Sequence, residues 1–131
     1  MYPQDNDAVG MNQEVIEQRL MEYAKRCMLF SRDLISLGYE DSRHLAKQLI
    51  RSGSHPGIHY GEARAAESRR DYTHKLGILL KELREAHNTV RIASMMDYYP
   101  AEQIQPLIKE GSELVAIMTA TVKKLKTNPN G

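Results

Sequence analysis

Apolar side chains recur along most of the chain at alternating spacings of four and three residues, the pattern of a helix with one buried face. The pattern is clearest in two stretches, 13–37 and 68–96. Asn12 and Ser68 stand where helix N-caps are expected, and Gly38 stands where a helix would end. The apolar stripes of the two stretches are Ile16, Leu20, Tyr23, Cys27, Phe30, Leu34 and Leu37, and Tyr72, Leu76, Leu79, Leu83, Ala86, Val90 and Ala93.

A third amphipathic stretch, 101–126, has an apolar face wider than one helical contact requires. Leu107, Leu114 and Ile117 fall outside its main stripe. An exposed apolar patch of this kind usually marks an interface, so we predict that these side chains contact a neighbouring subunit. The main stripe is Ile104, Ile108, Gly111, Val115, Met118, Val122 and Leu125.

The stretch 41–66 has a helical pattern interrupted by Gly53, Pro56 and Gly57. Glycine and proline break or kink an isolated helix, whereas small residues also let two helices approach closely. Because the apolar and small positions keep their register through Pro56, we predict a kinked helix rather than a loop. Its expected buried positions are Leu45, Leu49, Ser52, Pro56, His59 and Ala63.

Four helices with short connections predict an all-α fold, an antiparallel up-down four-helix bundle with a kinked second helix. The bundle is expected to span 12–126, between a disordered N-terminal segment, 1–11, and a flexible tail, 127–131. The expected helix bounds are 13–37, 41–66, 68–96 and 101–126.

Composition points to a cytoplasmic protein without a membrane partner. The 131 residues include one cysteine, so no disulfide can form within the chain, and no signal peptide or membrane-spanning apolar run is present. Cys27 lies on an apolar stripe, where a core role is expected rather than a catalytic one.

The net charge is +1, but residues 41–91 carry ten basic and six acidic side chains, a net of +4. This basic block would attract an anion, or it forms an ordinary solvated surface.

The segment 52–63, SGSHPGIHYGEA, resembles a known sequence pattern when it is taken together with the residues that follow. These are Ser68, Asp71, Tyr72, His74, Lys75, Leu76, Leu80, Lys81, Glu82 and Glu85. As a set they resemble the bacterial four-helix-bundle family named for the protein encoded in 23S rRNA intervening sequences. The resemblance spans about residues 40–95. Two positions depart from the family pattern: His59 replaces an asparagine, and Pro56 replaces an aliphatic residue.

The resemblance implies a four-helix subunit that assembles into a homopentamer. One branch of the family, the accessory variability determinant of diversity-generating retroelements, binds nucleic acid and a reverse transcriptase through a basic surface. The resemblance also implies a set of recurring polar positions, which we interpret as a structural network between helices, because buried charges persist only when paired. These positions are Glu62, Lys75, Lys81, Glu82 and Glu85.

Basic residues of the second helix and of its connection to the third helix, which Arg64, Arg69 and Arg70 flank, are the candidate nucleic-acid contacts, since phosphate binding needs surface Lys or Arg. A solvated loop is the competing interpretation. The candidates are Lys47, Arg51, Arg64, Arg69 and Arg70.

His55, His59 and Glu62 have a spacing that would place three metal ligands on one straight helix. Because Pro56 and Gly57 lie between the histidines, we favour one surface histidine and one packed histidine. The sequence therefore predicts no metal, no cofactor and no catalytic residue.

Two functional hypotheses follow. The first is a non-enzymatic oligomeric protein that binds RNA or DNA as an accessory factor, with a reverse transcriptase as partner in the related branch. The second is a structural or protein-interaction oligomer without a nucleic-acid role.

Overall fold

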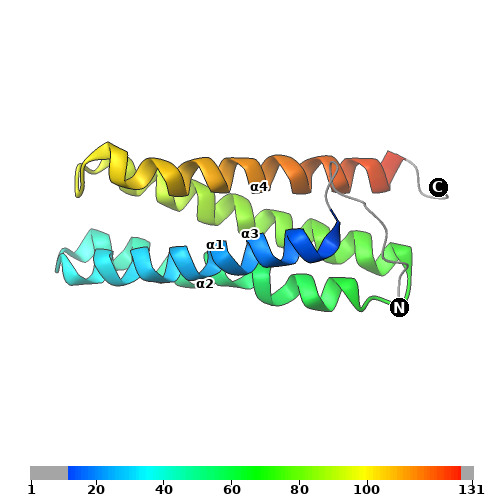
Figure 1. The fold of residues 1–131 in the computed structure, drawn as a ribbon. Helices are drawn as coiled ribbons and strands as arrows, with labels where there is room; N and C mark the ends of the chain where they lie inside the picture. The colour runs from blue at the N-terminus through cyan, green and yellow to red at the C-terminus, as the bar shows by residue number, and fades with distance from the viewer. Residues whose placement is uncertain (1–11, 128–131) are drawn as a thin grey trace.

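The computed structural model describes residues 12–127, which form four helices (Figure 1). The predicted disordered segment 1–11 and residues 128–131 of the predicted tail lie outside the described residues. The helices are α1 (Gln13–Ser36), α2 (Glu40–Arg64), α3 (Arg69–Met95) and α4 (Ala101–Thr127). The predicted all-α four-helix bundle is confirmed, with each boundary within two residues of its expected place.

Local capping explains where two of the helices begin and where α1 ends. The side chain of Asn12 accepts the backbone N–H of Val15 at 2.9 Å, and Ser68 accepts that of Asp71 at 3.1 Å. After α1, Gly38 adopts φ +79°, a left-handed conformation that glycine reaches without steric cost.

The helix α2 continues through Pro56 because its small residues pack directly on α1. A Cβ on Gly53 would lie 2.5 Å from the Cβ of Cys27, and one on Gly57 would lie 3.1 Å from the backbone oxygen of Leu20. Pro56 itself is buried, although it has no N–H to donate to the carbonyl of Ser52. Close approach of two helices therefore accounts for the small residues in this segment.

The core registers of α1 and α3 follow the expected stripes, and all seven stripe positions of α3 are buried. In α2 the expected Leu49, Ser52, Pro56 and Ala63 are buried, whereas Leu45 and His59 are only partly buried and their neighbours Ala46 and Tyr60 are buried instead. The prediction was therefore wrong by one position at Leu45 and at His59, and beside His59 it is Tyr60 that supplies the large buried side chain.

In α4 five of the seven expected stripe positions are buried, and the register differs at the other two, Ile108 and Val115. Leu107 and Leu114, predicted to face another subunit, are 7% and 0% exposed within the single chain. Ile108 and Val115 of the expected stripe are instead partly buried at the edge of the core. Leu107 and Leu114 are aliphatic neighbours of Ile108 and Val115 in the chain, and packing within the bundle buries the two leucines together with the rest of the stripe.

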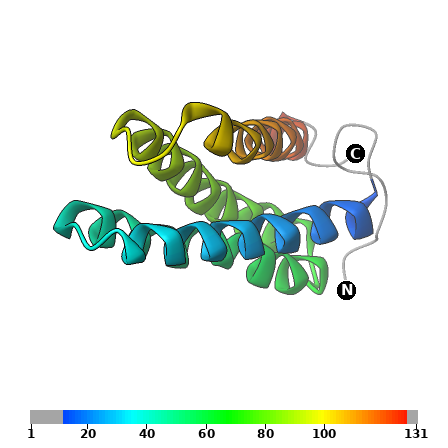
Figure 2. The ribbon, with the colours of Figure 1, turned by 60° about the vertical axis from the view of Figure 1, so that its left-hand side comes forward.

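Each helix packs chiefly on its neighbours in the chain, while α1 meets α4 along a smaller contact. Figure 2 shows α4 lying over α3. A second, smaller core of Leu34, Ala46 and Ala93 fills the end of the bundle near the α1–α2 and α3–α4 connections. None of the helices within 12–127 is long and apolar enough to cross a membrane.

Candidate nucleic-acid interface

A groove of about 790 Å³ runs between α3 and the C-terminal part of α4. Cationic and histidine side chains line its rim, and Val122 and Leu125, 7% and 4% exposed, belong to its apolar floor. No acidic residue lines the groove within the described residues. The lining residues that can carry positive charge are Arg69, Arg70, His74, Lys81, Arg84 and Lys126.

One face of α3 positions most of these groups. Arg70, His74, Lys81 and Arg84, with Gly77 between them, follow the same four-and-three spacing as the apolar stripe but lie on the exposed side of α3, away from the buried stripe. Residues at this spacing share a helical face, so their side chains extend to the same side of α3.

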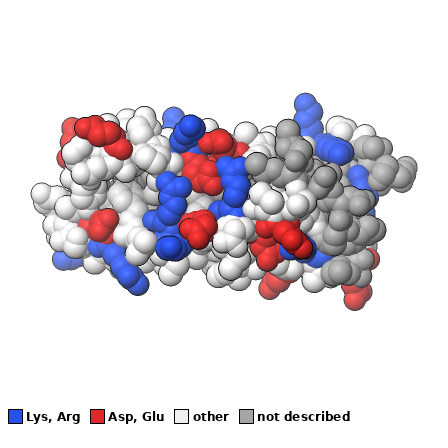
Figure 3. Space-filling view, viewed as in Figure 1, with Lys and Arg blue, Asp and Glu red and all other residues white. Residues whose placement is uncertain are grey.

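The groove is electrostatically one-sided, in contrast to other parts of the surface. On the face shown in Figure 3, Lys and Arg side chains lie interspersed with Asp and Glu. In the groove, the Arg84 guanidinium donates to the hydroxyl of Thr119 at 3.1 Å, a neutral partner that leaves its charge uncompensated by a carboxylate.

Of the five predicted contact residues, the groove brings together Arg69 and Arg70. Arg64 forms an ion pair with Glu17 of α1 at 3.1 Å, and Arg51 pairs with Glu85 of α3. Lys47 is exposed on α2, outside the groove.

Sequence reasoning missed Arg84 and Lys126 as groove residues and placed Lys81 in the structural network. The signal for Lys81 and Arg84 was present, since both continue the spacing that starts at Arg70. Lys126 comes from α4, and no local pattern links it to α3.

The predicted polar network is only partly an inter-helix one. Glu82 and Glu85 of α3 contact α2, but Lys75 pairs with Asp71 one turn earlier in its own helix, at 3.1 Å. Glu62 and Lys81 are exposed and form no ion pair within residues 12–127. Their positions on outward faces explain the difference.

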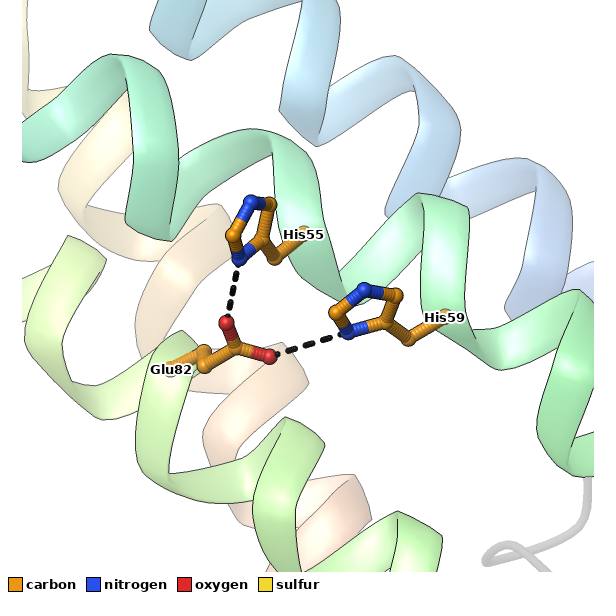
Figure 4. A group of neighbouring side chains, drawn as sticks. All are labelled: His55, His59 and Glu82. Atoms are coloured by element: carbon orange, nitrogen blue, oxygen red, sulfur yellow. Dashed lines mark hydrogen bonds and ion pairs between the residues drawn. The ribbon is translucent and has the colours of Figure 1, made fainter.

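The two histidines of α2 share one carboxylate of α3 (Figure 4). His55 Nδ1 lies 2.6 Å from Glu82 Oε2, and His59 Nδ1 lies 3.3 Å from Glu82 Oε1. The expectation of one surface and one packed histidine was wrong: both rings are about equally exposed, at 35% and 37%. Glu82, rather than Glu62, is the carboxylate that meets them.

An ion pair that the sequence did not predict links the first and last helices. Arg19 of α1 contacts Glu110 of α4 through two nitrogens, at 2.6 and 3.1 Å. This hydrogen bonding raises the pKa of the Arg19 guanidinium against the opposing effect of burial. The pair fixes α1 against α4 where the two helices have few other contacts.

Comparison with solved structures gives a match over most of the chain. A crystal structure from Bacteroides thetaiotaomicron, described as a protein with unknown function from the S23 ribosomal protein family, aligns with a TM-score of 0.75 and 26% sequence identity. The chain is thus similar to an S23-family protein. The alignment covers 86% of this chain and 99% of the S23-family chain. Neither a protein-family model nor a curated protein matches the chain.

Proposed function

We propose that the protein binds the phosphate backbone of a nucleic acid in the groove between α3 and α4. The observation that carries the proposal is the composition of the groove rim, which among residues 12–127 has basic side chains and no carboxylate. Phosphate contacts use Lys and Arg with little need for base recognition.

The length of the basic row suits a nucleic-acid strand. Arg70 and Arg84 are 14 residues apart on α3, which corresponds to about 21 Å along the helix axis. A strand of a duplex carries about six phosphates over that length. The row can therefore contact several consecutive phosphates rather than one small anion.

Among the described residues the groove lining includes neither Phe, Tyr nor Trp, and His74 supplies its one aromatic ring. Stacking platforms are the usual device of proteins that bind unpaired bases. We therefore propose contacts with the backbone that are independent of base sequence. The word "ribosomal" in the description of the similar protein makes RNA the first probe to test.

An accessory role rather than a catalytic one is part of the proposal. Burial raises the pKa of the Cys27 thiol to about 12, so the cysteine is a poor nucleophile. A reverse transcriptase is proposed as partner on the resemblance alone, and co-purification of the two proteins would test it.

The experiment is a fluorescence-anisotropy titration of single- and double-stranded RNA and DNA over a salt series. Arg70→Gln and Lys81→Gln should each lower the affinity for a duplex and reduce the log–log salt slope by about 0.9 per lost phosphate contact. Lys47→Gln, an exposed cation outside the groove, is the matched control and should behave like the wild type. Absence of binding to every probe at low salt, or an equal effect of Lys47→Gln, would refute the proposal.

A second candidate function is self-association, which a row of exposed apolar residues on α1 favours. Met21, Met28 and Ile35 are seven residues apart and 53%, 44% and 44% exposed. Seven-residue spacing places them on one face, as in helices that pack against a partner. The apolar face of α4 does not support this candidate, because Leu107 and Leu114 are buried in the single chain.

Light scattering tests this second candidate. We expect a mass that is a multiple of 15.0 kDa, with five copies as the number implied by the family resemblance. Met21→Glu combined with Met28→Glu should yield monomers, whereas Met95→Glu, at a position that is 79% exposed on α3, should not. A wild-type mass of one chain would reject self-association.

A further inference from the structure

Three side chains that can ligate a metal converge on the surface where α2 meets α3. His55, His59 and Glu82 each offer a ligand atom, and these atoms lie within 4.8 Å of one another. The ring centroids of the two histidines are 4.9 Å apart. Figure 4 shows both rings turned toward the same carboxylate.

The backbone holds this arrangement from both helices. His55 and His59 are four residues apart on α2, so they lie on one face of the helix only because α2 remains helical through Pro56. Gly53 and Gly57 press the opposite side of this segment against α1. The two imidazoles are therefore presented to α3 by a well-packed piece of backbone.

The ligand chemistry is selective. Two imidazole nitrogens and one carboxylate oxygen suit Zn²⁺ and similar transition metals, whereas Mg²⁺ and Ca²⁺ prefer oxygen alone. Tetrahedral Zn²⁺ with bonds of about 2.0–2.2 Å needs ligand atoms roughly 3.4 Å apart. The distance from His59 Nδ1 to Glu82 Oε1, 3.3 Å, is close to this value, and side-chain rotation would have to open the distance from His55 Nδ1 to Glu82 Oε2, which is 2.6 Å.

The surroundings permit a metal to enter. The side chains of His55 and His59 are 35% and 37% exposed, and that of Glu82 is 15% exposed. About one turn away on the two helices, the positive charge of Arg51 is matched by the carboxylate of Glu85. Solvent can supply a fourth ligand at such a site.

We propose that His55, His59 and Glu82 bind one divalent transition metal, with Zn²⁺ as the reference ion, and that the metal links α2 to α3. Since a metal that binds only the folded chain stabilises it, the ion would raise the melting temperature. The site does not use the basic groove between α3 and α4, so either proposal can fail without the other.

The test uses untagged, full-length protein freed of metal by a chelator and titrated with Zn²⁺ in competition with a chromophoric chelator. We expect one Zn²⁺ per chain and a rise in melting temperature. His59→Asn and Glu82→Gln should each weaken binding by at least about tenfold and abolish most of that rise. His44→Gln removes an exposed histidine of the same helix and should leave the affinity unchanged.

Co²⁺ gives a second readout that reports coordination directly. Bound to the wild type in a four-coordinate site it should produce strong visible d–d absorption, which His59→Asn should diminish. Circular dichroism checks that each variant folds. If the Glu82→Gln protein is unfolded, the Zn²⁺ affinity of the His59→Asn protein alone tests the proposal. The proposal is overturned if the wild type does not bind Zn²⁺ in the micromolar range, or if the His59→Asn protein binds it as well as the wild type.

Discussion

Tyr23 of α1 and His87 of α3 meet across Gly111 of α4. A Cβ on Gly111 would lie 2.8 Å from both the Tyr23 hydroxyl and His87 Nδ1. Both polar atoms are buried and have no nitrogen or oxygen partner within the described residues. Gly111 is thus the position where three helices share one small volume.

Replacement of Gly111 by alanine should destabilise the protein because the added methyl group displaces both rings in a packed core. We expect a loss of about 1–3 kcal/mol in the free energy of unfolding, measured by urea denaturation. Gly77→Ala on α3, where a Cβ would meet nothing within 4 Å, should instead stabilise by about 0.5–1 kcal/mol. In a Tyr23→Phe background the cost of Gly111→Ala should fall, since the hydroxyl is gone. Additive effects in that double-mutant cycle would contradict the contact.

The free energy of unfolding should decrease in mild acid because His87 becomes protonated more readily in the unfolded chain than in the folded one. Burial lowers the pKa of this imidazole, and the charge of Arg91 lowers it further. The unfolded chain, with an ordinary histidine pKa of about 6.5, then binds more protons than the folded chain as the pH falls below that value, so folding is penalised. The melting temperature should therefore drop when the pH is lowered from about 7.5 to about 5.5, an interval of about one unit on either side of that pKa. The drop should be smaller in His87→Gln than in the wild type or in the exposed-site control His44→Gln. Equal drops in all three proteins would exclude His87 as a source.

The contact between α1 and α2 should not tolerate a side chain at Gly53. An added Cβ would lie 2.5 Å from the Cβ of Cys27, and since both atoms are attached directly to the backbone, the helices would have to separate. Gly53→Ala should cost about 1–3 kcal/mol or more. The matched control is Gly61→Ala on the same helix, where the space is open and a gain of about 0.5–1 kcal/mol is expected from helix propensity. Chemical denaturation of the two variants side by side would measure the contrast, and a stable Gly53→Ala protein would show that α2 can move.

Leu83→Ala should cost about 2–5 kcal/mol, because Leu83 is fully buried in the main core. Leu76 and Leu79 are buried in the same cluster, together with Leu20 and Tyr23 of α1. Ile78→Ala on the same helix removes a side chain that is 45% exposed and should cost much less. A loss under about 1 kcal/mol for Leu83→Ala would show that the α3 register is wrong.

The fold was predictable because helix periodicity and capping are local signals. Asn12, Gly38 and Ser68 sit at the boundaries that their chemistry predicts, and the α3 stripe is buried throughout. The α4 register was not predictable in the same way. Leu107 and Ile108 are neighbours of similar hydrophobicity, and only the position of α3 determines which of them points inward.

The candidate sites were less accessible to sequence reasoning, since they form between helices. Glu62 lies three residues from His59 and was the natural third ligand by spacing, yet the carboxylate that meets both histidines is Glu82, 23 residues further along the chain than His59. Arg19 and Glu110 are 91 residues apart. Contacts of this kind depend on how far one helix is shifted along another, and no local pattern in the chain encodes that shift.

Because α1 and α2 approach closely at Gly53, the reactivity of Cys27 reports how often these two helices separate. Cys27 is the single sulfhydryl of the chain, fully buried against this glycine. A thiol reagent can reach it only when α1 and α2 part, so the rate of labelling under native conditions counts those opening events. Compared across denaturant concentrations, that rate would separate local opening of the helix pair from global unfolding, without any engineered probe.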